Sequence, residues 1–172
     1  SMGVPRLKEI LGSSEKVQNL IREPRSTDGK GVMLAVDQDF MAFLNSLNMC
    51  VFVVGQTQRQ ALNIDDLAEL VSTCTGVEMN GNDLLKIGER ISNIEKAFNI
   101  REGMGRKDDS LPAPFFVEKD TEWGPTGISE AKFQEMLDDY YKIRGWDHEG
   151  IPTRRKLEEL GIGYIAKQIG AA

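Results

Sequence analysis

The 172-residue sequence contains only two cysteines and one histidine, residue types from which many metal and catalytic centres are built. Cys50 and Cys74 lie far apart and have no Cys-x-x-Cys spacing. Two buried thiols in a reducing compartment are therefore the simplest interpretation, and neither cysteine could hold an iron–sulfur cluster alone. His148 lies between Asp147 and Glu149 in a polar turn, which favours an exposed side chain over a base or a metal ligand.

Long apolar runs and clusters of positive charge are also missing. No segment approaches the roughly 18 apolar residues that a membrane-spanning helix needs, and no charged stretch precedes an apolar one as in a secretory signal. The net charge is -6 without a clustered basic face, which argues against a nucleic-acid site because Lys and Arg supply most of that affinity. We expect a cytoplasmic protein that binds neither nucleic acid nor membrane.

Apolar residues recur at intervals of three and four, which predicts an all-α fold of five or six helices around one core. The predicted N-caps are Asn63, Asn82, Ser129 and Thr153. Gly88 interrupts the longest helix, and we expect a neighbouring backbone to approach it closely. Residues 51–54 are expected to extend a helix, Trp146 to lie in the core, and residues 103–128 to form a long irregular loop rich in Pro and Gly, without a convincing pair of strands.

The sequence divides into three parts. Residues 1–30 are expected to form a loosely helical N-terminal segment, in which Ser1 and Met2 could be the remnant of an expression tag. Residues 31–161 form the predicted helical domain, and residues 162–172 a tail. No spacing forms a self-sufficient active site, and Asp108 and Asp109 are better explained as an exposed ionic loop than as a general acid–base pair.

Several uncommon segments occur in an order that composition does not explain: residues 98–103, 106–112 and 140–147, with 45–50 further upstream. In these segments the chain resembles the C-terminal helical region of the tungsten-containing aldehyde:ferredoxin oxidoreductases, from about residue 11 to residue 161. Within the resemblance, Arg101, Glu102 and residues 106–112 are interpreted as structural ties that fix the loop against the helices.

The resemblance implies an enzyme that oxidises aldehydes to carboxylic acids at a tungsten held by two pyranopterins. An adjacent 4Fe-4S cluster would pass the electrons to ferredoxin. It implies that Cys50 gives that cluster its fourth thiolate and that Met49 and Cys50 lie against one pterin. Asn45 stands where the family has a pterin-contacting aspartate, and Asn48 and Met49 replace its glycine and leucine. The Asn45 side chain can still accept hydrogen bonds from the pterin N–H groups, but without the negative charge of the aspartate. Asn48 can adopt the left-handed backbone conformation of the glycine that it replaces.

The other three cluster cysteines and the N-terminal pterin-binding domain belong to regions that this sequence does not contain. We therefore expect the chain by itself to be metal-free and inactive, with no catalytic residue of its own and with residues 49–54 forming a cut domain interface. Its partners would be the N-terminal and middle domains and ferredoxin. Molybdenum could replace tungsten. Two alternatives stay open: a separate helical scaffold protein that has lost the redox site, and a subunit that completes a split oxidoreductase in trans.

Overall fold

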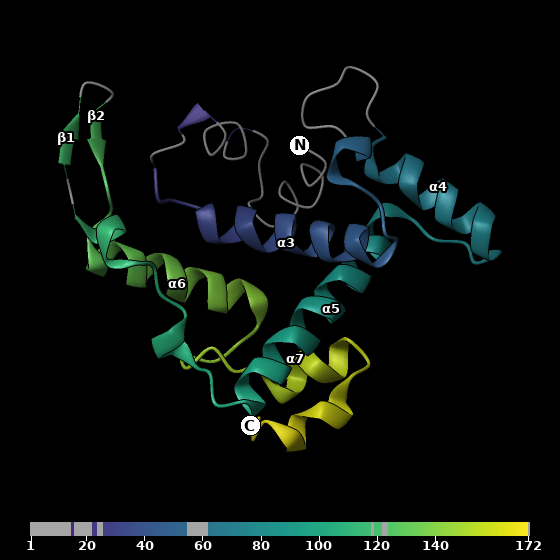
Figure 1. Ribbon diagram of the computed structural model, residues 1–172. Coiled ribbons are helices and arrows are strands. Elements are labelled where there is room, and N and C mark those ends of the chain that lie inside the picture. The colour runs from purple at the N-terminus through teal and green to yellow at the C-terminus, as the bar shows by residue number, and fades with distance from the viewer. Residues whose placement is uncertain are drawn as a thin grey trace.

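The computed structural model describes residues 26–54, 62–117, 119–121 and 124–171, together with residues 15, 22 and 23. Its described part is helical, which confirms the predicted all-α class (Figure 1). The α-helices are α3 Lys30–Ser46, α4 Ile64–Thr75, α5 Gly81–Arg101, α6 Glu130–Arg144 and α7 Arg154–Glu159. Short 3-10 helices lie between and after them: η1 Val51–Val54, η2 Arg106–Asp108, η3 Ala113–Phe116 and η4 Gly163–Gln168.

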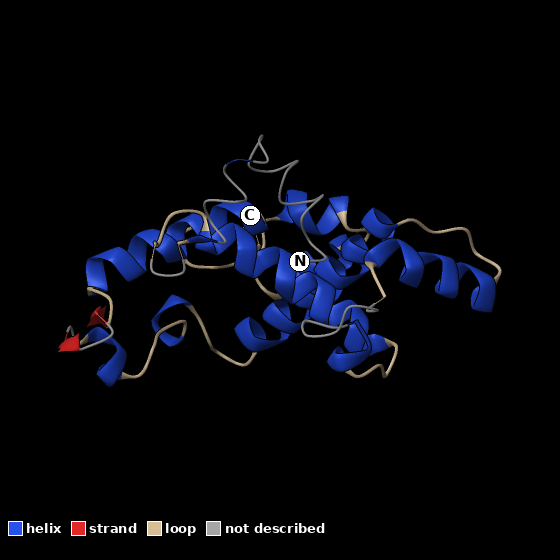
Figure 2. Cartoon of the chain, turned by 90° about the horizontal axis from the view of Figure 1, so that it is seen from above, coloured by secondary structure: helices blue, strands red, loops and turns tan. Residues whose placement is uncertain are grey.

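The predicted irregular loop carries one pair of strands, which the sequence did not indicate. Strand β1 Lys119–Thr121 pairs antiparallel with β2 Gly124–Thr126, and this small hairpin lies at one end of the molecule (Figures 1 and 2). Three-residue strands are too short to show the alternation of apolar and polar residues from which strands are predicted. Among the described helices, none combines the length and the apolar character needed to cross a membrane.

Local capping chemistry sets the helix boundaries. The predicted caps Asn63, Ser129 and Thr153 are confirmed, since each side chain accepts hydrogen bonds from backbone N–H groups of the following turn. The predicted cap of α5 was wrong by two residues, because the cap is Asn80 rather than Asn82. Asp83 lies three residues after Asn80 and its carboxylate accepts a hydrogen bond from the Asn80 N–H at 2.9 Å, which completes a capping box.

The prediction for Gly88 is confirmed by the crossing of α5 over α3. A Cβ atom built on Gly88 would lie 1.8 Å from the carbonyl oxygen of Asp39 and 2.5 Å from its carbonyl carbon. Only a residue without a side chain permits this contact, so Gly88 fixes where the two helices cross. Ser92, one turn further along α5, donates a hydrogen bond to the Asp39 carboxylate at 3.0 Å.

The buried apolar side chains form two clusters instead of the single core that was predicted. The first joins α3, α4 and the start of α5, and includes Phe43, Leu44 and Leu67. The second joins the end of α5 to α7 and η4, and includes Leu157 and Ile165. Residues 162–171 therefore pack into the second cluster rather than forming a tail, because their apolar side chains cover α7. Most of the predicted N-terminal segment, including the suggested tag remnant, lies outside the described residues.

Candidate functional site

The segment of residues 45–50 forms the C-terminal end of α3 and the turn that follows it. The N–H of Asn48 donates to the carbonyl of Asn45 at 3.0 Å, and the N–H of Met49 donates to the carbonyl of Leu44 at 3.4 Å. This pair of bonds is the Schellman arrangement, which requires a left-handed residue just beyond the helix. Asn48 fills that position with φ 54, the only positive φ of a described residue other than glycine. The expectation that Asn48 adopts the left-handed turn of a glycine is confirmed.

The turn directs the four predicted cofactor-binding residues differently. Met49 is half-buried and packs against the first apolar cluster, whereas Asn45, Asn48 and Cys50 are exposed. The interpretation of both cysteines as buried thiols was wrong, since Cys50 and Cys74 are both exposed and free. Cys50 follows the end of α3 by four residues, so the helix does not shield its thiol. The Cys50 sulfur is thus accessible to a ligand brought by another part of a protein.

A groove of about 1240 Å³ runs beside this segment and is bounded by α3, α5 and α6. Asn45 and Ser46 line it from α3, and Phe133 and Tyr140 line it from α6. Lys96 and Asp109 contribute charged groups from α5 and the end of η2. Of the four predicted site residues, Asn45 lines this groove, and Asn48, Met49 and Cys50 do not.

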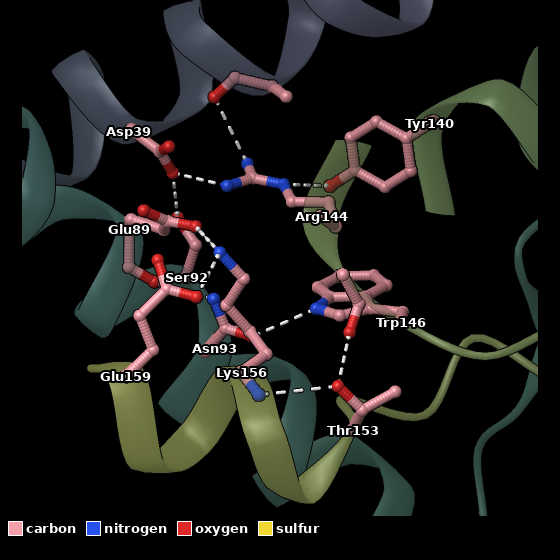
Figure 3. A network of polar contacts seen from close by, with 12 residues as sticks. Asp39, Glu89, Ser92, Asn93, Tyr140, Arg144, Trp146, Thr153, Lys156 and Glu159 are labelled. Atoms are coloured by element: carbon pink, nitrogen blue, oxygen red, sulfur yellow. Dashed lines mark hydrogen bonds and ion pairs between the residues drawn. The ribbon is translucent and has the colours of Figure 1, made fainter. Parts of the chain in front are cut away.

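A buried polar network holds the helices that frame the groove (Figure 3). Arg144, at the end of α6, is only 1% exposed and forms an ion pair with Asp39 of α3. Its guanidinium also donates to the Ala35 carbonyl at 3.2 Å and to the Gln38 side chain at 2.8 Å, and the Tyr140 hydroxyl accepts its Nε–H at 3.1 Å. These four hydrogen bonds all go to residues of α3 and α6, which locks the two helices together.

The charges in this network shift one another's titration. Burial raises the pKa of the Asp39 carboxyl, and the adjacent Arg144 guanidinium opposes that change. Burial disfavours the Arg144 cation, but Asp39 and Tyr140 outweigh it and raise its pKa. Removing one partner would leave the other charge buried and uncompensated, which is costly. The pair is therefore a structural lock rather than a reactive group.

The same network reaches the second apolar cluster. Lys156 of α7 donates to the Glu89 carboxylate of α5 at 2.9 Å (Figure 3). The indole N–H of Trp146 donates to the Asn93 side chain at 2.8 Å, and Trp146 is buried as predicted. These residues were missed as a network by sequence reasoning. A charged residue within an apolar helical stripe is the sequence signal that could have indicated them. Such a residue is rarely buried unless it is paired, so it implies a buried partner of opposite charge.

A second set of contacts ties the irregular loop to the helices. The Asp109 carboxylate accepts hydrogen bonds from the Lys96 ammonium and the Tyr141 hydroxyl. Arg106 donates to Gln134 at 2.7 Å and to the His148 carbonyl at 2.8 Å. The structural role expected for residues 106–112 is confirmed for Arg106 and Asp109. Asp109 is more than the exposed ionic residue that was predicted, because Lys96 pairs with it from an almost fully buried position.

Arg101 and Glu102 do not take part in these ties. Their side chains are both exposed and form an ion pair with each other at 3.2 Å. The tie predicted for them was therefore wrong, because they lie on the outer side of α5 at its end. The His148 side chain is 85% exposed, as predicted. Within the described residues no group of three or more His, Cys, Asp or Glu side chains could hold a metal ion.

Comparisons with known proteins agree with the resemblance seen in the sequence. The family model described as aldehyde ferredoxin oxidoreductase, domains 2 and 3, matches residues 3–162. The tungsten-containing aldehyde ferredoxin oxidoreductases of Pyrococcus furiosus and Thermococcus kodakarensis are 38% and 37% identical to this chain over 156 residues. Each alignment covers 90% of this chain but 24% of the relative, so the chain spans about a quarter of their length.

Two other proteins are similar to this chain at lower identity. The aliphatic sulfonate oxidoreductase, WOR-like subunit, of Pyrococcus furiosus is 27% identical over 140 residues, which is 74% of this chain and 21% of that protein. Among solved structures, the active site complex BamBC of benzoyl coenzyme A reductase, in complex with 1,5-dienoyl-CoA, superposes with a TM-score of 0.70 at 27% identity. The match covers 84% of this chain and 21% of the other.

Proposed function

This chain belongs to the aldehyde ferredoxin oxidoreductase family, and from that premise we propose that it is the C-terminal part of a larger tungsten-pterin, iron–sulfur oxidoreductase. The parent enzyme oxidises aldehydes to carboxylic acids in the cytoplasm and passes the electrons to ferredoxin. The observation that carries the proposal is the turn at residues 45–50, where Asn48 keeps a left-handed backbone and Cys50 follows it with an exposed thiol. The substrate class and the acceptor come from the family.

Cys50 suits the role of a cluster ligand contributed to a site that lies mainly elsewhere. A thiolate is the usual protein ligand of a 4Fe-4S cluster, and four are normally required. The sequence has only two cysteines, and Cys74 lies within helix α4, outside the turn. The other three thiolates must therefore come from a different part of the parent protein. In this role Cys50 is a tether between the cluster and the end of α3.

Asn45 suits a neutral contact to a pterin. Its exposed carboxamide can donate and accept hydrogen bonds, whereas the aspartate found at this position in the family only accepts when ionised. Asn45 therefore orients a pterin edge without adding a negative charge next to it. When bound, the metal–pterin group supplies the oxidation chemistry, and the residues of this chain supply placement and the electrostatic environment.

The experiment that tests the proposal is recovery of the native polypeptide from its own cells with an antibody against this chain. A polypeptide several times longer than 172 residues that contains iron and tungsten is the expected product. In that protein, Cys50→Ser should lower the iron content and change the cluster's electron paramagnetic resonance signal. Cys74→Ser, which changes the other exposed thiol, should do neither.

A second function is favoured by the changes at Asn45, Asn48 and Met49, three departures from the family in six residues. Loss of the redox site would leave a helical scaffold protein, or a subunit that assembles with a partner. A native product near 19.2 kDa without metal would establish the scaffold and end the enzymatic proposal. A small product that binds metal only in a complex, and loses it with Cys50→Ser, would instead establish a split enzyme.

A further inference from the structure

Helix α3 carries two different faces along its length. One face places Phe40, Phe43 and Leu44 in the first apolar cluster. The other side has the helical spacing 34, 38, 41 and 45, and it lines the groove with Leu34, Gln38, Met41 and Asn45. Met41 lies between the two sides, because it also packs against the first apolar cluster. Helices α5 and α6 both contact α3, yet Leu34 on this second side stays exposed, so part of the side is left uncovered.

The α6 wall of the groove carries several apolar side chains. Phe133, Met136 and Leu137 line it from α6, and all three are only partly covered. Leu34 remains 51% exposed on the facing side. A volume of about 1240 Å³ exceeds the range of roughly 300–1,000 Å³ in which small-molecule sites are usually found. The size of the groove and the apolar side chains on its α6 wall fit a polypeptide segment better than a small ligand.

The groove continues to the residue that the proposed function places beside the cofactor. Asn45 borders it at the end of α3, and the cofactor would be held mainly by the part of the parent that lies outside this chain. The relatives are about four times as long as the aligned region, so the parent has ample polypeptide to cover this face. We propose, resting on the proposed function, that the groove receives an apolar segment from the remainder of the same parent polypeptide.

Methionine oxidation provides a test that needs no mutation. Met136 lines the groove, whereas Met104 is 46% exposed and does not line it. Mild peroxide oxidation, followed by mass spectrometry, compares the 172-residue chain with the native polypeptide. We expect Met136 to react at least about fivefold more slowly in the native polypeptide, because a docked segment excludes the oxidant, while Met104 changes much less.

Two outcomes of this comparison overturn the proposal. Met136 could already be protected from oxidation in the 172-residue chain, in which case the occupant of the groove is a second copy or a segment of this chain. Dilution distinguishes these two sources, because only protection by a second copy is lost at low protein concentration. Alternatively, Met104 and Met136 could lose reactivity to the same degree, which would show general coverage rather than docking in the groove.

A pair of matched substitutions adds a second test in the native polypeptide. Leu34→Lys introduces a charge into the groove, and Val77→Lys introduces one at a residue that is also 51% exposed and lies outside it. Leu34→Lys should restore the oxidation rate of Met136 towards that of the short chain, and Val77→Lys should not. Neither variant should unfold the short chain. Equal effects of both variants would refute the proposal.

The failure of this inference is distinguishable from failure of the proposed function. A long native polypeptide that contains iron and tungsten, but in which Met136 reacts as fast as in the short chain, would refute the groove and leave the enzyme intact. A native polypeptide of 172 residues without metal would refute both.

Discussion

Replacement of Gly88 by alanine provides the sharpest test of how α3 and α5 are joined. In an exposed helix this change stabilises a protein by about 1 kcal/mol, because glycine loses more backbone freedom on folding. Here the added Cβ would lie 1.8 Å from the Asp39 carbonyl oxygen, which belongs to backbone and cannot rotate away. The helices would have to separate by more than about 1 Å.

Such a separation also affects the neighbours of Asp39. It lengthens the hydrogen bond from Ser92 and strains the ion pair with Arg144. Overpacking usually costs about 1–3 kcal/mol and a lost hydrogen bond about 1 kcal/mol. After the gain of about 1 kcal/mol in helix propensity is subtracted, we expect Gly88→Ala to lower the free energy of unfolding by about 1–3 kcal/mol. This is a large part of the roughly 5–15 kcal/mol by which domains are usually stable.

The measurement is urea-induced unfolding of the 172-residue chain, followed by the helical circular dichroism signal. Gly105→Ala is the matched control, because a Cβ on Gly105 would meet no atom within 4 Å and its φ of -158 suits any residue. The control should be stabilised by about 0.5 kcal/mol. A Gly88→Ala variant that unfolds at the same or a higher urea concentration than the unmodified chain would refute the reasoning.

Three further predictions concern the turn, the cap and the buried tyrosine. Asn48→Gly should leave the free energy of unfolding within about 0.5 kcal/mol, whereas Asn48→Ala should lower it by about 1 kcal/mol, because alanine disfavours a left-handed backbone; equal losses in urea unfolding would contradict this. Asn80→Ala should lower the free energy of unfolding by about 1 kcal/mol, and Asn82→Ala should lower it much less. Thermal unfolding that shows the reverse order would place the cap at Asn82. Burial and the hydrogen bond to Asp109 raise the pKa of Tyr141 above its ordinary value of 10.0, so the unfolded chain releases this proton first. The stabilisation of the folded chain by this proton is complete below about pH 10 and is lost as the pH rises further. The free energy of unfolding, measured at about pH 9 and pH 11, should therefore fall less in Tyr141→Phe than in the unmodified chain. An equal fall in both would exclude Tyr141 as the source of the alkaline loss.

The helices and most of their caps could be predicted from the sequence because they depend on local interactions. A cap such as Asn63 bonds to N–H groups two and three residues away, and an apolar stripe repeats within each turn. Asn48 belongs to the same class, since its left-handed backbone follows from the helix end and from its own tolerance of that conformation. The error at Asn82 arose within this local range, from overlooking the carboxylate that completes the box around Asn80.

Exposure of the candidate site residues could not be predicted in the same way. Cys50 precedes an apolar run and Cys74 falls on an apolar helical stripe, which favoured burial, but their exposure depends on which helix faces find partners. The helix end places Met49 against the first cluster and leaves Cys50 outside it. A sequence pattern records which side chains are apolar, and only packing decides which of their polar or small neighbours are covered.

By itself the sequence determined the helical class, the family, the turn at Asn48 and the need for a glycine at position 88. Only the tertiary structure decided that Gly88 contacts Asp39, that Arg144 locks α6 to α3, and that residues 162–171 join a second apolar cluster. The physical reason is the distance along the chain between the partners. Helix periodicity and capping act within a few residues, whereas Asp39 and Arg144 meet across 105 residues, and no local pattern specifies such a pair.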